Sequence, residues 1–144
     1  MNAPASPDPA PALARRFADF AEGLRLETVP GEVSLRARHL MLDAIGCAMA
    51  ARGEVFASRF ADAVRDVSGP AAASAEAAVI GFAGRLPMRD AALLNGMLMH
   101  GLDYDDTHMA GIVHLTVSVL PTLLAVAGQA VNTACPPRSR RCTR

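Results

Sequence analysis

Apolar residues recur at every third or fourth position along several stretches of this chain, and no other feature limits its fold as much. Leu13, Phe17, Phe20 and Leu24 follow this spacing in residues 12–25, with charged residues between them, which predicts an amphipathic helix. With one Tyr, five Phe and no Trp in 144 residues, the core must be built from Ala, Leu, Val and Met. Such a core favours helices over sheets, so the sequence predicts an all-α fold.

Glycines and prolines divide the rest of the chain into further expected helices. These cover residues 32–51, 55–67 and 87–102, and a last helix starts near Thr116 or Ser118 and reaches residue 127. Residues 71–78 fit either a helix or a linker, and residues 78–82 fit a short extended segment closed by a turn at Gly84. The positions expected to be buried are Val33, Leu40, Ile45 and Met49 in the second helix, and Phe56, Phe60, Ala63 and Val67 in the third.

Charge is unevenly distributed although the formal net charge is zero. All fourteen acidic residues lie at or before Asp106, while four arginines lie in the last seven positions. The body of the chain therefore carries ten basic and fourteen acidic residues, which argues against a nucleic-acid-binding domain. Residues 128–144 lack apolar periodicity, and we predict an irregular basic tail there.

The sequence favours a cytoplasmic protein with no membrane span. Residues 112–131 are uncharged and nearly long enough to cross a bilayer, but they include His114 and Gln129, so we interpret them as a buried helix or subunit interface. Residues 1–11 show no signal peptide and are predicted to be a disordered arm. The cysteines have no paired spacing, which fits reduced thiols; they are Cys47, Cys135 and Cys142.

A polar segment interrupts the apolar sequence at residues 95–108. Burying charged groups without partners is costly, so a concentration of carboxylates and histidines beside core-like sequence needs a reason. If the preceding helix continues for one more turn, His100, Asp103 and Thr107 share a face and Asp105 points away from it. A fold-back at Gly111 would then bring His114 to the same place.

Three interpretations of this cluster remain open from the residues alone. It can be structural, with aspartates capping a helix and histidines satisfied by hydrogen bonds. It can be an acid–base site, because a carboxylate facing a histidine suits proton transfer next to a carbonyl or carboxylate group. It can also bind a metal ion, although no established ligand spacing is present; the candidate ligands are His100, Asp103, Asp106 and His108. His39 is expected at the surface, and Cys47 is expected to pack as a small apolar residue.

The polar segment resembles the MmgE/PrpD family, also called the 2-methylcitrate dehydratase family. The resemblance rests on Ala-Leu-Leu-Asn-Gly at residues 92–96 and His-Gly-Leu-Asp-Tyr-Asp-Asp-Thr-His at residues 100–108. His114 and an Ala/Leu/Val-rich helix follow, and upstream landmarks occur in the same order at residues 42–47 and 79–81. The resemblance covers residues 13–127.

The resemblance implies an incomplete N-terminal helical domain, at residues 12–127, of a lyase that acts on small di- or tricarboxylic acids without a cofactor or metal. Family activities include dehydration of 2-methylcitrate, decarboxylation of cis-aconitate and epimerisation of iminodisuccinate. By position, Asp103 and His114 would be catalytic, while Thr107 and His100 would bind substrate. The resemblance also implies a homodimer.

Two departures from the family pattern stand out. Leu115 and Thr116 follow His114 where the family commonly has proline and serine. Family chains are also much longer, with further helices and a second, α/β domain that supplies a lysine and a histidine to the site. We therefore hypothesise a truncated or frame-shifted member whose tail, residues 128–144, is out of frame and whose activity alone is weak or absent. The alternative is a non-catalytic helical interaction or oligomerisation fragment.

Overall fold

The computed structural model describes residues 12–69 and 77–134, and this part of the chain is mostly helical, as predicted. Its elements are α1 (Leu13–Gly23), the 3-10 turn η1 (Leu26–Thr28), α2 (Gly31–Ala51), α3 (Val55–Ser68), β1 (Ala77–Ala78), β2 (Arg85–Leu86), α4 (Met88–His100) and α5 (Thr116–Ala134). The expected disordered arm at residues 1–11 lies outside the described residues, as does most of the ambiguous segment at residues 71–78.

The chain forms two units that divide between Arg36 and Ala37. In the first unit, α1 has no buried residue. Its apolar stripe is well exposed, with Phe17 and Phe20 showing 65% and 67% of their surface to solvent. The amphipathic helix expected at residues 12–25 is therefore present and ends two residues early, at Gly23.

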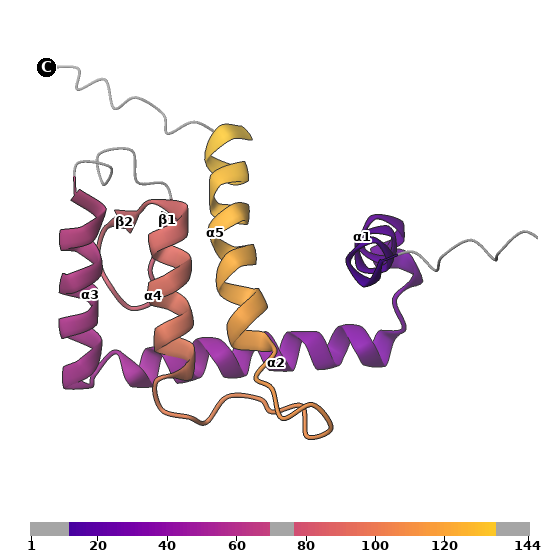
Figure 1. Ribbon diagram of the computed structural model, residues 1–144, viewed down its shortest axis with the longest axis horizontal. Helices are drawn as coiled ribbons and strands as arrows, with labels where there is room; N and C mark the ends of the chain where they lie inside the picture. Colours follow the sequence, from indigo (N-terminus) through magenta and orange to yellow (C-terminus); the bar gives the residue numbers. More distant parts are fainter. Residues whose placement is uncertain (1–11, 70–76, 135–144) are drawn as a thin grey trace, which may run out of the picture. The chain divides into compact units, whose positions relative to one another are not determined.

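In the second unit, α3, α4 and α5 stand side by side, and the second half of α2 crosses near their ends (Figure 1). The core between them combines a few large side chains of α4 with many small ones. Leu94, Leu98 and Met99 of α4 are fully buried. Alanines supply much of the remaining core, namely Ala44, Ala48, Ala51, Ala57, Ala61, Ala77, Ala91 and Ala125. Because alanine is short, the helix backbones can approach closely.

The buried faces of α2 and α3 match the predicted ones only in part: Leu40, Ile45, Phe56 and Phe60 are partly buried, whereas the other predicted positions are exposed. Val33 and Met49 are each about half exposed (51% and 53%), and Val67 is 80% exposed. The buried residues are instead Ala44, Ala48 and Ala51 in α2, and Ala57, Ala61, Val64 and Ser68 in α3. Large apolar side chains define the apparent stripe in the sequence, whereas close packing selects the small residues beside it.

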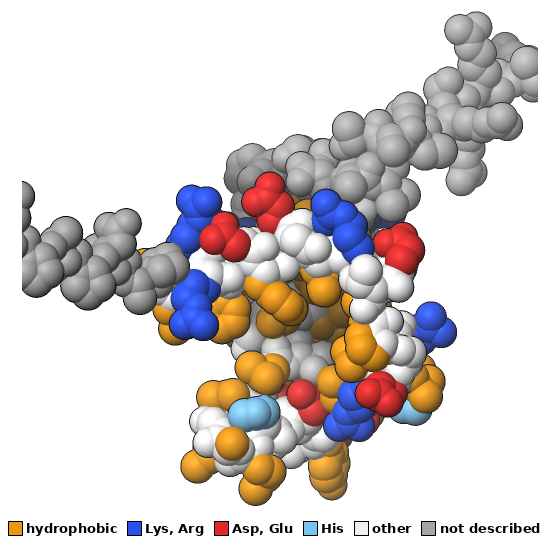
Figure 2. Space-filling model, turned by 90° about the vertical axis from the view of Figure 1, so that its right-hand side faces the viewer, with side chains coloured by type: hydrophobic (Ala, Val, Ile, Leu, Met, Phe, Trp, Pro, Cys, Tyr) orange, Lys and Arg blue, Asp and Glu red, His pale blue; other side chains and the backbone are white. Residues whose placement is uncertain are grey.

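Many large hydrophobic side chains remain exposed. Leu42 shows 71% of its surface, and Ile112 in the loop before α5 shows 83%. Figure 2 shows side chains of this kind among charged ones on one face of the molecule. Apolar patches of this kind commonly mark binding surfaces.

A short hairpin lies between α3 and α4. Ala77 pairs with Leu86 and Ala78 with Arg85 in an antiparallel register. The extended segment expected at residues 78–82 is therefore shifted, and residues 79–84 form the connection. Gly81 and Gly84 adopt φ angles of 74° and 90°, which glycine reaches without steric cost.

Asn95 of α4 holds this hairpin in place. Its side-chain nitrogen donates to the Ala78 carbonyl at 3.0 Å, and its side-chain oxygen accepts from the Ile80 backbone N–H at 2.8 Å. Asn95 is 1% exposed, so both bonds are made away from water, where an unpaired amide would be costly.

α5 begins at Thr116 as expected but continues to Ala134, seven residues beyond the predicted end. A single glycine inside a helix costs only about 1 kcal/mol, so Gly128 does not end it. The part of the predicted basic tail at residues 135–144 lies outside the described residues. None of the described helices is both long and apolar enough to cross a membrane.

Pro121 lies inside α5 and cannot donate the backbone hydrogen bond that would reach the Val117 carbonyl. That carbonyl faces Gly96 of α4. A Cβ atom at Gly96 would lie 3.4 Å from the Val117 oxygen and 3.6 Å from Pro121 Cγ. The proline therefore lies where α4 and α5 pack closely.

Candidate active site

α4 ends at His100, and the additional turn expected after it does not form. Asp103 has a φ angle of 56°, in the left-handed region, and its N–H donates to the His100 carbonyl at 2.8 Å. Aspartate tolerates this conformation better than most residues. The chain turns there, so the predicted helical face shared by His100, Asp103 and Thr107 is wrong.

Thr107 is exposed, and no hydrogen bond joins it to Asp103 in the described part of the chain. Gly101 occupies the first position of the turn. A Cβ atom there would lie 2.7 Å from the ring of Phe56 in α3. A side chain at position 101 would therefore clash with this ring.

Asp105 is the buried centre of the cluster, although the sequence predicted that it would point away. Its side chain is 1% exposed. Asp105 Oδ1 lies 2.9 Å from His100 Nδ1, and Asp105 Oδ2 lies 3.0 Å from His114 Nδ1. Because α4 ends at His100, Asp105 points into the cluster instead of away from it. The glycine directly after His100 is the sequence signal for this helix end.

The two contacts differ in quality. The His100 contact is aligned as a hydrogen bond, whereas Asp105 Oδ2 and His114 Nδ1 are in close contact without that alignment. The centres of the two imidazole rings are 4.9 Å apart, with an angle of 59° between their planes. Since the His100 and His114 side chains are 50% and 30% exposed, the cluster is buried on its Asp105 side and accessible on the other.

Asp103 joins this group, which brings together three of the four predicted site residues. One ligand atom from each of His100, Asp103, Asp105 and His114 lies within 4.8 Å of the others. Two imidazoles and two carboxylates are donors that a divalent transition metal accepts. Among the described residues, this group does not include Asp106 or His108, so the ligand set considered from the sequence is only half right.

His108 has a different environment. Its Nδ1 accepts a hydrogen bond from the Gly111 N–H at 3.1 Å, and its backbone pairs with Val113. The side chain therefore stabilises the loop at residues 108–113. His39 is exposed, as expected.

Cys47 of α2 is half-buried and lies within electrostatic reach of the cluster. Burial raises the pKa of its thiol above the usual value, and the negative charges of Asp43 and Asp105 raise it further. A thiol with a raised pKa is a weak nucleophile near neutral pH. This fits the expectation that Cys47 packs as a small apolar residue.

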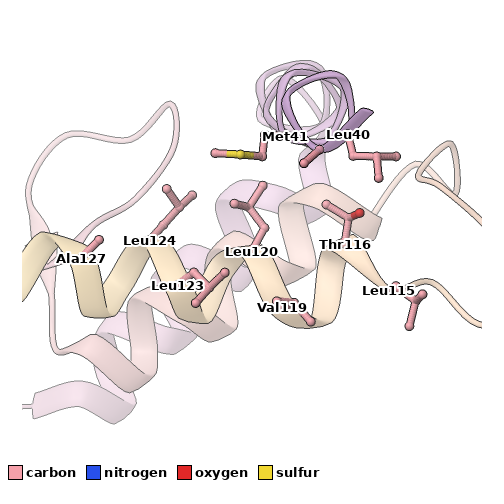
Figure 3. A pocket seen from close by; sticks show the side chains of 10 residues that line it. Leu40, Met41, Leu115, Thr116, Val119, Leu120, Leu123, Leu124 and Ala127 are labelled. Atoms are coloured by element: carbon pink, nitrogen blue, oxygen red, sulfur yellow. The ribbon is translucent and has the colours of Figure 1, made fainter. Parts of the chain in front are cut away.

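An apolar groove lies between α2 and α5 (Figure 3). Part of its lining directly follows His114 in the sequence. Its volume is about 480 Å³. Leu40 and Met41 of α2 face Leu120 and Leu124 of α5 across it. Among the described residues its only polar side chain is that of Thr116, so this groove offers no charged group to bind a carboxylate.

Comparison with known proteins identifies the family to which this chain is similar. Residues 15–137 match the model of the MmgE/PrpD N-terminal domain, which extends ten residues beyond the resemblance visible in the sequence. The cis-aconitate decarboxylase-like protein oryM of Aspergillus oryzae is 33% identical over 104 residues, covering 72% of this chain. The cis-aconitate decarboxylase of Aspergillus terreus is 28% identical over 108 residues, covering 75% of this chain.

The chain spans 21% of the length of each of these relatives. The family match, by contrast, covers most of the chain and includes α2 to α5 and the whole cluster around Asp105. The chain belongs to the MmgE/PrpD family, as an N-terminal domain.

Proposed function

We propose that this chain supplies acid–base groups to a lyase that acts next to a carboxylate on small di- or tricarboxylic acids. The observation that carries the proposal is the cluster of His100, Asp103 and His114 around the buried carboxylate of Asp105. The names of the relatives support cis-aconitate as the first substrate to test, with 2-methylcitrate as the second.

Both reactions need a group that gives or takes a proton at carbon. In decarboxylation, the bond between the substrate carbon and its carboxylate breaks, CO₂ leaves, and the electron pair left behind is captured by a proton. In dehydration, a base removes the proton on one carbon while an acid protonates the hydroxyl that leaves the next carbon. A positioned acid–base pair typically contributes 10²–10⁴-fold to such steps.

We assign the proton-transfer roles to Asp103 and His114, and the positioning of substrate to His100 and Thr107. The short distances within the cluster support the first three assignments. The assignment of Thr107 rests on the family resemblance, because this side chain is exposed in the loop.

Cations that hold the substrate carboxylates must come from elsewhere. The chain has no lysine, and residues 90–137 contain no arginine. A tricarboxylate bound at the cluster would otherwise face the two aspartates Asp103 and Asp105. We therefore propose that cationic groups outside residues 90–137 complete the site.

The test is to incubate the purified chain with cis-aconitate and with 2-methylcitrate and to follow the loss of CO₂ or water by mass spectrometry. Asp103→Asn and His114→Gln should each lower turnover by about 100-fold or more. His39→Gln changes an exposed histidine outside the cluster and should leave turnover unchanged. Retention of full turnover in Asp103→Asn would exclude the assigned role.

An interaction module is the second candidate function. It is favoured by the unfilled groove between α2 and α5 and by the exposed apolar stripe of α1. This function predicts a folded, oligomeric chain that shows no saturable binding of citrate-like acids in calorimetry. Saturable binding that disappears in His100→Gln would instead favour the lyase.

A further inference from the structure

We propose that Asp105 is a positioning residue that fixes the tautomer of two histidines at once. Its carboxylate would hold His100 and His114 with the proton on Nδ1, which leaves Nε2 of both rings free to accept a proton or contact a substrate. The use of these Nε2 atoms in catalysis rests on the proposed function, but the tautomers themselves do not.

The chemistry of the two contacts places the proton on Nδ1 of each ring. An ionised carboxylate only accepts hydrogen bonds, and a neutral imidazole carries its proton on one nitrogen. His100 Nδ1 and His114 Nδ1 lie 2.9 and 3.0 Å from separate oxygens of Asp105. At these distances a nitrogen lone pair would face an oxygen lone pair unless each Nδ1 carries the proton. The hydrogen bond at one ring nitrogen thus determines the state of the other.

The Asp105 carboxylate is buried between the two rings. Asp105 is 1% exposed, and its Oδ2 atom and His114 Nδ1 have no aligned hydrogen-bond partner. Among the described residues, the two rings are the only side chains in close contact with the Asp105 carboxylate oxygens.

The three residues lie where α4 ends and α5 is about to begin. His100 is the last residue of α4, and His114 lies two residues before α5 begins. Asp105 lies in the loop between them, so one carboxylate fixes the relative placement of both helix ends. The ring centres are 4.9 Å apart, and both side chains are partly exposed.

His108 provides an internal contrast in the same molecule. Its Nδ1 accepts from the Gly111 N–H, so its proton must be on Nε2. The structure therefore assigns opposite tautomers to His108 and to the His100–His114 pair.

The experiment is a long-range ¹⁵N–¹H correlation spectrum of the full chain labelled with ¹⁵N-histidine, recorded at a pH where the rings are neutral. His100 and His114 should show the Nδ1–H pattern, and His108 the Nε2–H pattern. Either ring of the pair in the Nε2–H form would overturn the inference, and this result needs no variant.

Asp105→Asn provides the second measurement. Asparagine keeps one acceptor oxygen and replaces the other with an amide donor, so at least one of the two rings should lose the Nδ1–H form. Asp106→Asn alters the neighbouring carboxylate, which is outside the cluster, and should leave both rings unchanged. Two unchanged rings in Asp105→Asn would show that the residue only supports the loop.

The inference and the proposed function can fail separately. If the chain shows neither turnover nor saturable binding of cis-aconitate and 2-methylcitrate but both tautomers are as assigned, the inference holds and the lyase proposal falls. If turnover is present but a ring has the other tautomer, the positioning role falls and the lyase proposal remains.

Discussion

The Ser68 hydroxyl donates to Asp90 Oδ2 at 2.7 Å and thereby joins the last residue of α3 to the first turn of α4. The Asp90 side chain is 6% exposed, and its other oxygen accepts from Arg89 Nε at 2.8 Å. These bonds favour the charged carboxylate, first through Arg89 and then through Ser68, and they hold the pKa of Asp90 below its usual value. Asp90 lies in the first turn of α4, where an acidic residue is favourable, but its place in the sequence gives no sign of its partner in α3.

The lowered pKa of Asp90 predicts a loss of stability in acid. Because its folded-state pKa lies below the unfolded value of about 3.9, the stabilisation is complete above that value and is lost as the pH falls through the folded pKa. Asp90→Asn should therefore cost about 1–2 kcal/mol at neutral pH and flatten the acid side of the stability profile. Urea unfolding followed by circular dichroism between pH 3 and 7 would measure both effects.

Asp62 offers the matched control for this prediction. It pairs with Arg65 at 3.2 Å on the surface of α3, with 75% of its side chain exposed. Exposed ion pairs contribute little, so Asp62→Asn should leave the stability and its pH dependence almost unchanged. Equal losses in the two variants would contradict the role given to the Ser68–Asp90 bond.

The two hydrogen bonds between Asn95 and the hairpin predict that the hairpin and α4 unfold together. Asn95→Leu removes both bonds and leaves the Ile80 N–H and the Ala78 carbonyl unpaired, which should cost about 2 kcal/mol or more. Asn95→Asp retains an acceptor for Ile80 and loses the donor to Ala78, so hydrogen exchange should accelerate less at Ile80 than in Asn95→Leu. Equal protection of Ile80 in both variants would exclude this division of roles.

Two glycines should respond in opposite directions to alanine. Gly101→Ala places a methyl group against Phe56 and should destabilise the chain by about 1–3 kcal/mol. Gly46, inside α2, has no atom within 4 Å of an added Cβ, so Gly46→Ala should stabilise by about 0.5–1 kcal/mol. Thermal unfolding would measure both changes. Adding Phe56→Leu should recover part of the Gly101→Ala loss, and its failure to do so would place the clash elsewhere.

The group of four potential ligands also permits a direct test for metal. The family resemblance predicts no metal, so removal of divalent ions with a chelator should leave the unfolding midpoint unchanged. Elemental analysis of the purified chain should likewise show no stoichiometric zinc or manganese. Stoichiometric metal that is lost in both Asp105→Asn and His114→Gln would instead identify the cluster as a metal centre.

The boundaries of the helices could be predicted from the sequence because glycine and proline mark them. α2 and α3 begin and end within one residue of the expected positions. Their buried faces could not be predicted in the same way. In α3 the apparent stripe is shifted by one position from the buried residues Ala57, Ala61 and Val64. Alanine is compatible with either environment, so only the neighbouring helix decides which alanines are buried.

The candidate site was predicted in part. His100, Asp103 and His114 do come together. They do not share the expected helical face, because α4 ends at His100 and the additional helical turn does not form. Helical spacing therefore gives the wrong orientation for Asp105. Its burial depends on the conformation of the loop after α4, which helical spacing does not describe. The homodimer implied by the resemblance stays a prediction.

The left-handed backbone at Asp103 affects how any substitution there must be interpreted. At a φ angle of 56°, alanine would pay a conformational cost of about 1–2 kcal/mol that aspartate and asparagine largely avoid. An alanine variant would therefore report on loop geometry and carboxylate chemistry together. Asparagine keeps the backbone preference and the side-chain shape while removing the charge, so a comparison of the two variants separates the contribution of the turn from that of the acid.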